Sequence, residues 1–188
     1  FKKIGALLVA AIMVLAMAST AFADGPTATI TVNNADKATL TYAQVIRADQ
    51  TTRTGWDFVN DDVKNAYIEA YGVADDDAQA AIEALIANTD AEKLGKAQAL
   101  AAGKVSFVKM SNPQTVSEAG VYLVKATEVG YTYNIMSAYV GFGEAPNLTN
   151  AIVNAKKTPI QVNKKVLDTD NVTKTGDILT YTVSTNVP

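Results

Sequence analysis

The chain contains no cysteine and no histidine among its 188 residues. Without cysteine the fold cannot be cross-linked by disulfides, and without histidine the commonest general base and metal ligand is missing. A Cys/His zinc site, a Ser-His-Asp triad and a Cys-His pair are therefore excluded within this sequence. Composition leaves open an enzyme built on carboxylates or on serine and lysine, but no such constellation stands out. We predict a protein that is not an enzyme and needs no cofactor.

Positive charge is also scarce. The sequence has 16 Lys and Arg against 19 Asp and Glu, and its net charge is −3. Nucleic acids and anionic membranes require clustered cations, so we expect neither as a partner. A hydrophobic content of 48% with only 19% charged residues supports a packed core and argues against a disordered chain.

The first 23 residues have the pattern of a secretory signal peptide. Lys2 and Lys3 precede an almost wholly apolar run from Ile4 to Met17, and Ala21-Phe22-Ala23 has the small residues of a cleavage site. The alternative, a membrane anchor, would need a longer apolar run. Cleavage after Ala23 would remove two lysines and no acid, leaving 14 basic and 19 acidic residues and a net charge of −5. Because the sequence opens on Phe1 and stops just after a strand-like segment, we interpret it as part of a longer protein.

Hydrophobic periodicity predicts a mainly β fold, an immunoglobulin-like β-sandwich with a helical insertion. Residues 56–70 carry apolar side chains at helical spacing from Trp56 to Ala70, and two shorter helices are expected at 77–87 and 89–102. We expect strands at 28–32, 38–46, 105–110, 120–127, 133–142 and 151–155, and further strands at 160–167 and 177–185. A domain boundary is expected near Thr158-Pro159, which separates a first domain at 24–157 from the start of a second at 158–188.

One lysine interrupts an apolar strand face. In Val162-Asn163-Lys164-Lys165-Val166, alternation puts Lys164 on the same side as the two valines. If that side is buried, desolvation lowers the pKa of the amine and makes Lys164 a nucleophile. Two alternatives stay open: Lys164 lies at a strand edge with its amine in water, or a different register places Lys165 inside.

Two segments near the end of the sequence resemble part of a known family. They are residues 162–166 and the run Gly176-Asp177-Ile178-Leu179-Thr180-Tyr181-Thr182-Val183-Ser184-Thr185-Asn186-Val187-Pro188. Together they are similar to the start of the isopeptide-forming domain of Gram-positive fimbrial shaft pilins. Residues 28–48, the helical block and Gly120-Val121-Tyr122-Leu123-Val124 are similar in layout to the domain that precedes it in that family. The resemblance implies a secreted structural subunit of a cell-wall pilus. It also implies that Lys164 forms an internal amide bond with an asparagine on a late strand, assisted by a buried acid, with both partners beyond Pro188.

The family joins its subunits through a lysine in a Val-Tyr-Pro-Lys motif, which attacks the sortase-bound C terminus of another subunit. The corresponding stretch here is Ile152-Val153-Asn154-Ala155-Lys156-Lys157, which has valine and lysine but lacks Tyr-Pro. Lys156 lies eight residues before Lys164, a spacing that resembles the family's, and Lys157 is the alternative. Without the resemblance, a lysine pair before Thr-Pro is typical of a solvated linker.

Glu128 closes the strand at 120–127 and faintly resembles the assisting glutamate of small pilin domains. Its simpler interpretation is a charge at a strand end. On the resemblance, we expect identical subunits and a pilus-specific sortase as partners, with a host surface ligand as a further candidate. The rival hypotheses are a singly anchored adhesin that binds a host glycan or matrix protein, and a secreted hydrolase built on two facing acids.

Overall fold

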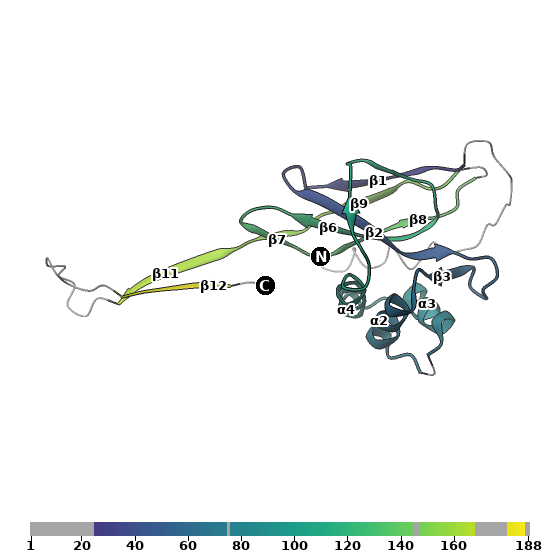
Figure 1. Ribbon diagram of the computed structural model, residues 1–188, viewed down its shortest axis with the longest axis horizontal. Helices are drawn as coiled ribbons and strands as arrows, with labels where there is room; N and C mark the ends of the chain where they lie inside the picture. The colour runs from purple at the N-terminus through teal and green to yellow at the C-terminus, as the bar shows by residue number, and fades with distance from the viewer. Residues whose placement is uncertain (1–24, 75, 145–146, 168–179, 187–188) are drawn as a thin grey trace, which may run out of the picture.

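The computed structural model describes residues 25–74, 76–144, 147–167 and 180–186 of the chain. The signal-like segment at 1–23 lies outside these residues. The described part is mainly β: two packed sheets form a sandwich, and a block of three helices covers the outer face of one sheet (Figure 1). The predicted β-sandwich with a helical insertion is confirmed.

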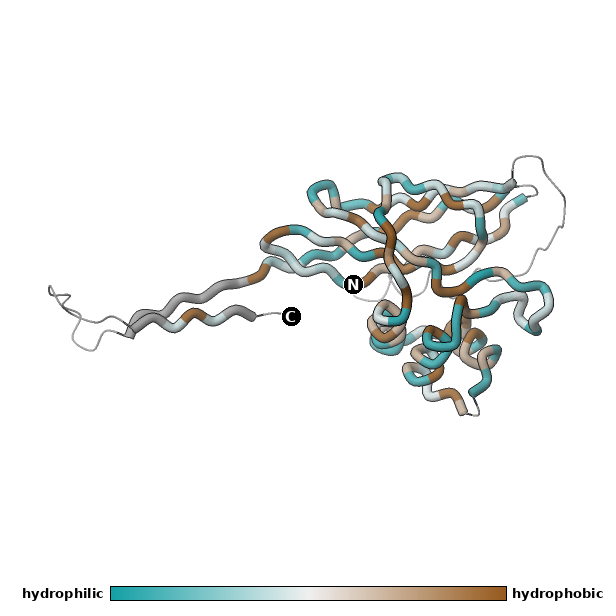
Figure 2. The backbone as a smooth tube through the Cα atoms, viewed as in Figure 1, coloured by the Kyte–Doolittle hydropathy of each residue, from teal (hydrophilic) through white to brown (hydrophobic). Residues whose placement is uncertain are grey.

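The smaller sheet of the sandwich has the order β5-β1-β9. Strand β1 (Ala28–Asn33) runs antiparallel to β5 (Gln114–Val116) and parallel to β9 (Ala151–Asn154). The larger sheet has the order β3-β2-β6-β8, formed by β3 (Trp56–Phe58), β2 (Thr39–Ala48), β6 (Gly120–Thr127) and β8 (Met136–Val140). A two-residue strand, β4 (Val108–Lys109), also pairs with β2. Apolar and polar residues alternate along β1 and β8, as expected for strands with one covered face, whereas β6 is buried over its first five residues (Figure 2).

Each of the three helices begins at an Asn or Asp that caps it. Asn60 accepts a hydrogen bond from the Val63 amide ahead of α2 (Asp61–Tyr71). Asp77 caps α3 (Ala78–Ile86) and Asp90 caps α4 (Ala91–Ala101) in the same way. These side chains satisfy amide groups that the first helical turn leaves unpaired, which fixes where each helix starts.

The predicted helical stripe from Trp56 was wrong at its start. Trp56 and Phe58 lie in β3, which pairs with the end of β2, and the helix begins only at Asp61. The Asn60 cap, which the sequence pattern did not single out, separates the two elements. Trp56 is nevertheless buried, as its apolar spacing indicated, and its ring packs against Tyr139 and Phe142.

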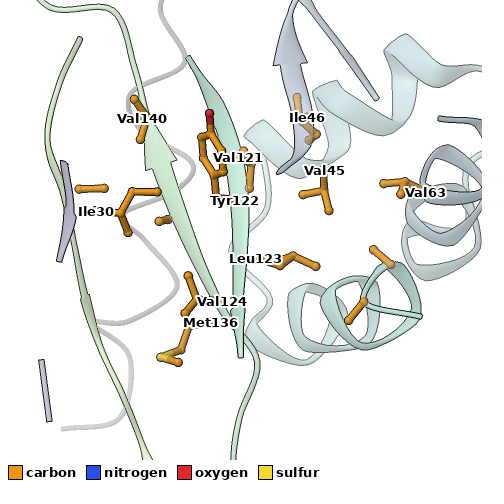
Figure 3. Close-up of a cluster of buried hydrophobic side chains, with 14 of the residues drawn as sticks. Ile30, Val45, Ile46, Val63, Val121, Tyr122, Leu123, Val124, Met136 and Val140 are labelled. Atoms are coloured by element: carbon orange, nitrogen blue, oxygen red, sulfur yellow. The ribbon is translucent and has the colours of Figure 1, made fainter. Parts of the chain in front are cut away.

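Strand β6 lies at the centre of the core. Its side chains alternate, so that Leu123 faces Val63 of α2 while Tyr122 and Val124 face Ile30 of the smaller sheet (Figure 3). Leu123 and Val63 have no exposed surface. The helices and the sandwich therefore share a strand whose two faces are both buried.

After the sandwich, the chain pairs once more with the first domain and then forms a separate hairpin. Strand β10 (Lys157–Pro159) lies antiparallel to β7 (Tyr131–Tyr133). Strands β11 (Gln161–Leu167) and β12 (Thr180–Asn186) pair with each other and project away from the sandwich (Figure 1). The single strand predicted at 133–142 is thus two strands, because β7 pairs with β10 and β8 pairs with β6.

Candidate functional site

The lysine pair lies where the sandwich ends and β10 begins. Strand β9 ends at Asn154, and the Ala155 amide donates a hydrogen bond to the Asn33 carbonyl at 3.0 Å. Ala155 is buried, whereas Lys156 and Lys157 are exposed. The backbone bond and the buried alanine hold the segment to the end of β1, so both lysines start from a fixed point on the domain.

Lys157 is held by a cluster of three side chains, which we call the clasp: Glu128, Tyr131 and Tyr133. The Lys157 Nζ lies 3.0 Å from Oε2 and 3.3 Å from Oε1 of Glu128. It also lies 4.3 Å from the centre of the Tyr131 ring, a cation–π distance. The Tyr133 hydroxyl donates a hydrogen bond to Glu128 Oε2. The amine is therefore bound on two sides.

A tight turn builds the clasp. The Tyr131 amide donates to the Glu128 carbonyl, and Gly130 between them has a φ of 82°, a conformation that glycine adopts without strain. The turn sends β7 back alongside β10, with Tyr133 opposite Lys157. The Ile160 amide then donates to the Gly130 carbonyl at 2.9 Å, which fastens the end of β10 to the same turn.

The contacts shift the ionisation of Glu128, Tyr133 and Lys157. The hydrogen bond from Tyr133, followed by that from Lys157, lowers the pKa of Glu128. The hydrogen bond to Glu128 raises the pKa of Lys157 and that of Tyr133. The Glu128 side chain is only 10% exposed and that of Lys157 is 37% exposed. At neutral pH the pair is ionised, and protonated Lys157 is a poor nucleophile.

Lys156 has a different environment from its neighbour. Its side chain is exposed, and it makes no hydrogen bond or ion pair with any other residue that the structure describes. An amine in this position can enter the active site of another protein without first breaking an internal contact.

Lys164 lies in β11, opposite Val183 of β12, and Lys165 lies opposite Thr182. The surroundings of both lysine side chains fall outside what the structure describes, so the choice between them stays a prediction. The same holds for the internal bond assigned to Lys164.

Sequence reasoning identified Lys156, Lys157 and Glu128 separately but missed that Glu128 binds Lys157. It also missed Tyr131 and Tyr133. The two tyrosines alternate just after a Gly-containing turn, which is a signal for a short strand. The partner strand β10 lies more than twenty residues further on, and nothing local indicates that pairing.

None of the helices in the described ranges is both long and apolar enough to cross a membrane. Within the same ranges, no three acidic side chains gather closely enough to hold a metal ion.

No protein-family model matches the chain. No curated protein matches it either. Among solved structures, it is similar to the T6 backbone pilin of serotype M6 Streptococcus pyogenes, which has a modular three-domain structure decorated with variable loops and extensions. The sequence identity is 18% and the TM-score is 0.47. The similarity covers 89% of this chain and 37% of that one, so the chain spans little more than a third of that pilin's length.

Proposed function

We propose that the protein is a structural subunit of a surface pilus, joined to identical subunits through an amide bond at Lys156. The observation that carries the proposal is the contrast between two adjacent lysines at the end of the sandwich. Lys157 is bound by Glu128, whereas Lys156 is exposed and has no partner among the described residues. The sequence resemblance to shaft pilins supplies the reaction class.

In the proposed reaction, the deprotonated Nζ of Lys156 attacks the carbonyl carbon that joins a sortase to the C terminus of another subunit. A C–N bond forms and the bond between that carbon and the sortase breaks, its electron pair leaving with the sortase. The proton of the amine passes to a base of the sortase. Lys157 would have a positioning role. The clasp fastens β10 to β7, which limits the movement of the neighbouring Lys156 backbone.

Residues 158–188 would begin a second β domain after the first domain at 24–157. A two-stranded hairpin is marginally stable in water, and the Val183 side chain is 59% exposed, so additional strands are needed to cover it. Lys164 would form an amide with an asparagine of that domain and release ammonia. Such a cross-link would limit the spread of the unfolded chain, as a disulfide does.

The test is polymer formation in a cell that expresses the full-length protein and its sortase. We expect Lys156→Ala to abolish the ladder of high-mass species on a denaturing gel of wall extracts, and Lys157→Ala to weaken it. Lys93→Ala, which removes an exposed lysine from α4, is the matched control and should leave the ladder intact. A normal ladder from the Lys156→Ala, Lys157→Ala double variant would refute the proposal.

A further inference from the structure

The two strands that carry most of the clasp, β7 and β10, form a ribbon with two different faces. In their register, Lys157 lies opposite Tyr133 and Thr158 lies opposite Thr132. Successive residues of a strand point to opposite faces, so Lys157, Tyr131 and Tyr133 share one face and the two threonines lie on the other. The ring that binds the Lys157 amine and the hydroxyl that binds Glu128 are therefore on the same side of the ribbon.

The Glu128 carboxylate is fully used within the clasp. Its Oε1 lies 3.3 Å from the Lys157 Nζ, and its Oε2 lies 3.0 Å from that Nζ and also accepts a hydrogen bond from the Tyr133 hydroxyl. Lys37 also lowers the pKa of Glu128, but by less than Lys157 does. The carboxylate makes no ion pair with Lys156 in the part of the chain that the structure describes. Glu128 therefore distinguishes between two lysines that are adjacent in the sequence.

This distinction matters for a reaction at an amine. An amine that attacks an acyl group must first lose its proton and leave its partners. Lys157 would have to separate from a mostly buried carboxylate, which keeps the amine charged, and from the Tyr131 ring at 4.3 Å. Lys156 is exposed and has no such contact to break among the described residues. The clasp therefore makes Lys157 the poorer acceptor of the pair.

We propose that Glu128 decides which of the two lysines is joined to another subunit, by holding the Lys157 amine out of the reaction. This inference rests on the proposed function and names the residue that sets its site. Glu128 acts through Lys157, so it is a positioning residue. A released Lys157 reacts as Lys156 does. Its deprotonated Nζ forms a C–N bond to the acyl carbon, and the bond from that carbon to the sortase breaks, its electron pair leaving with the sortase. The proton passes to a base of the sortase.

The experiment maps the branch point in polymer from cells that express the full-length protein and its sortase. Tandem mass spectrometry of a digest compares branched peptides at Lys156 and at Lys157. Glu128→Gln keeps the size of the side chain and removes its charge. It should raise the ratio of Lys157 to Lys156 branches by about tenfold or more, the effect of losing a hydrogen bond to a charged group. A merely structural role for Glu128 would lower the amount of polymer without moving the branch.

A Lys156→Ala background gives a sharper contrast. Lys156→Ala alone should form no ladder, because Lys157 is held. Adding Glu128→Gln should restore the ladder, with its branches at Lys157. Adding Tyr133→Phe instead is the matched control, since it removes one hydrogen bond of the clasp but keeps the carboxylate, and the ladder should stay absent. Tyr131→Leu removes the ring beside the amine and should restore a weaker ladder, which tests the clasp even if Glu128→Gln fails to fold.

Three results would overturn the inference while leaving the subunits joined. They are branches at Lys157 in the unchanged protein, a ladder from Lys156→Ala alone, and no ladder when Glu128→Gln is added to Lys156→Ala in a protein with an unchanged melting temperature. A different result would refute the proposed function itself, and this inference with it. That result is an unchanged protein that yields no branched peptide at either lysine.

Discussion

Leu123→Ala should destabilise the helices and the sandwich together. Leu123 has no exposed surface, lies at the centre of β6 and faces the helical block (Figure 3). Its neighbours across the strands, Ala43 and Ser137, are held in register on both sides, so the backbone cannot collapse into the space left by the missing methyl groups. Leu→Ala changes at such sites cost about 2–5 kcal/mol, and we expect about 3 kcal/mol here.

The assay is urea denaturation with two probes. Far-ultraviolet circular dichroism reports on helices and strands, and fluorescence reports on Trp56, the only tryptophan of the chain, which is buried in β3. With a slope of roughly 1–3 kcal/mol per molar urea, the midpoint should fall by about 1–3 M. The two probes should give one coincident transition in both proteins if the domain unfolds as a unit.

Val129→Ala is the control for this measurement. Val129 is 98% exposed, so its truncation should change the free energy of unfolding by no more than about 0.5 kcal/mol. A loss below about 1 kcal/mol for Leu123→Ala would contradict the shared core. Separate transitions for the two probes would show that the helices and sheets unfold independently.

Three further predictions concern the clasp and one tight backbone contact. Glu128 raises the pKa of Lys157, so an amine-reactive ester at pH 8–9 should label Lys156 faster than Lys157. Glu128→Gln should narrow the difference between the two labelling rates. Equal labelling rates in the unchanged protein would contradict the clasp. Because the pKa of Glu128 is lowered by folding, its contribution to stability is present above the unfolded value of about 4.3 and is lost as pH falls through the folded value. The unfolding free energies of the unchanged protein and Glu128→Gln should therefore converge as the pH falls from the unfolded value through the lower folded value of Glu128, and a constant gap would count against the shift. Gly120→Ala should destabilise the fold by about 1–3 kcal/mol, because the added Cβ would lie 2.1 Å from the Ile46 carbonyl oxygen; an unchanged melting temperature would contradict that contact.

The sequence predicted the elements whose signals are local. Strands β1, β2 and β6 follow apolar alternation, and α3 begins at the Asp77 cap. It misjudged elements that depend on partners elsewhere. Trp56 fits a helical spacing, yet pairing with the end of β2 draws it into a strand.

The candidate site also combines local features, which the sequence predicts, with contacts between distant residues, which it does not predict. A lysine pair before Thr-Pro is visible in the sequence, but the ionic contact between Glu128 and Lys157 spans 29 positions. It depends on the turn at Gly130 and on the register of β7 with β10, which local patterns do not encode.

The most direct test of the pilus assignment is tandem mass spectrometry of a protease digest of wall-extracted polymer. We predict a branched peptide in which the Lys156 amine carries the C-terminal residues of another subunit. Wall material that runs only as single subunits, with unmodified Lys156 and Lys157 recovered in linear peptides, would contradict it.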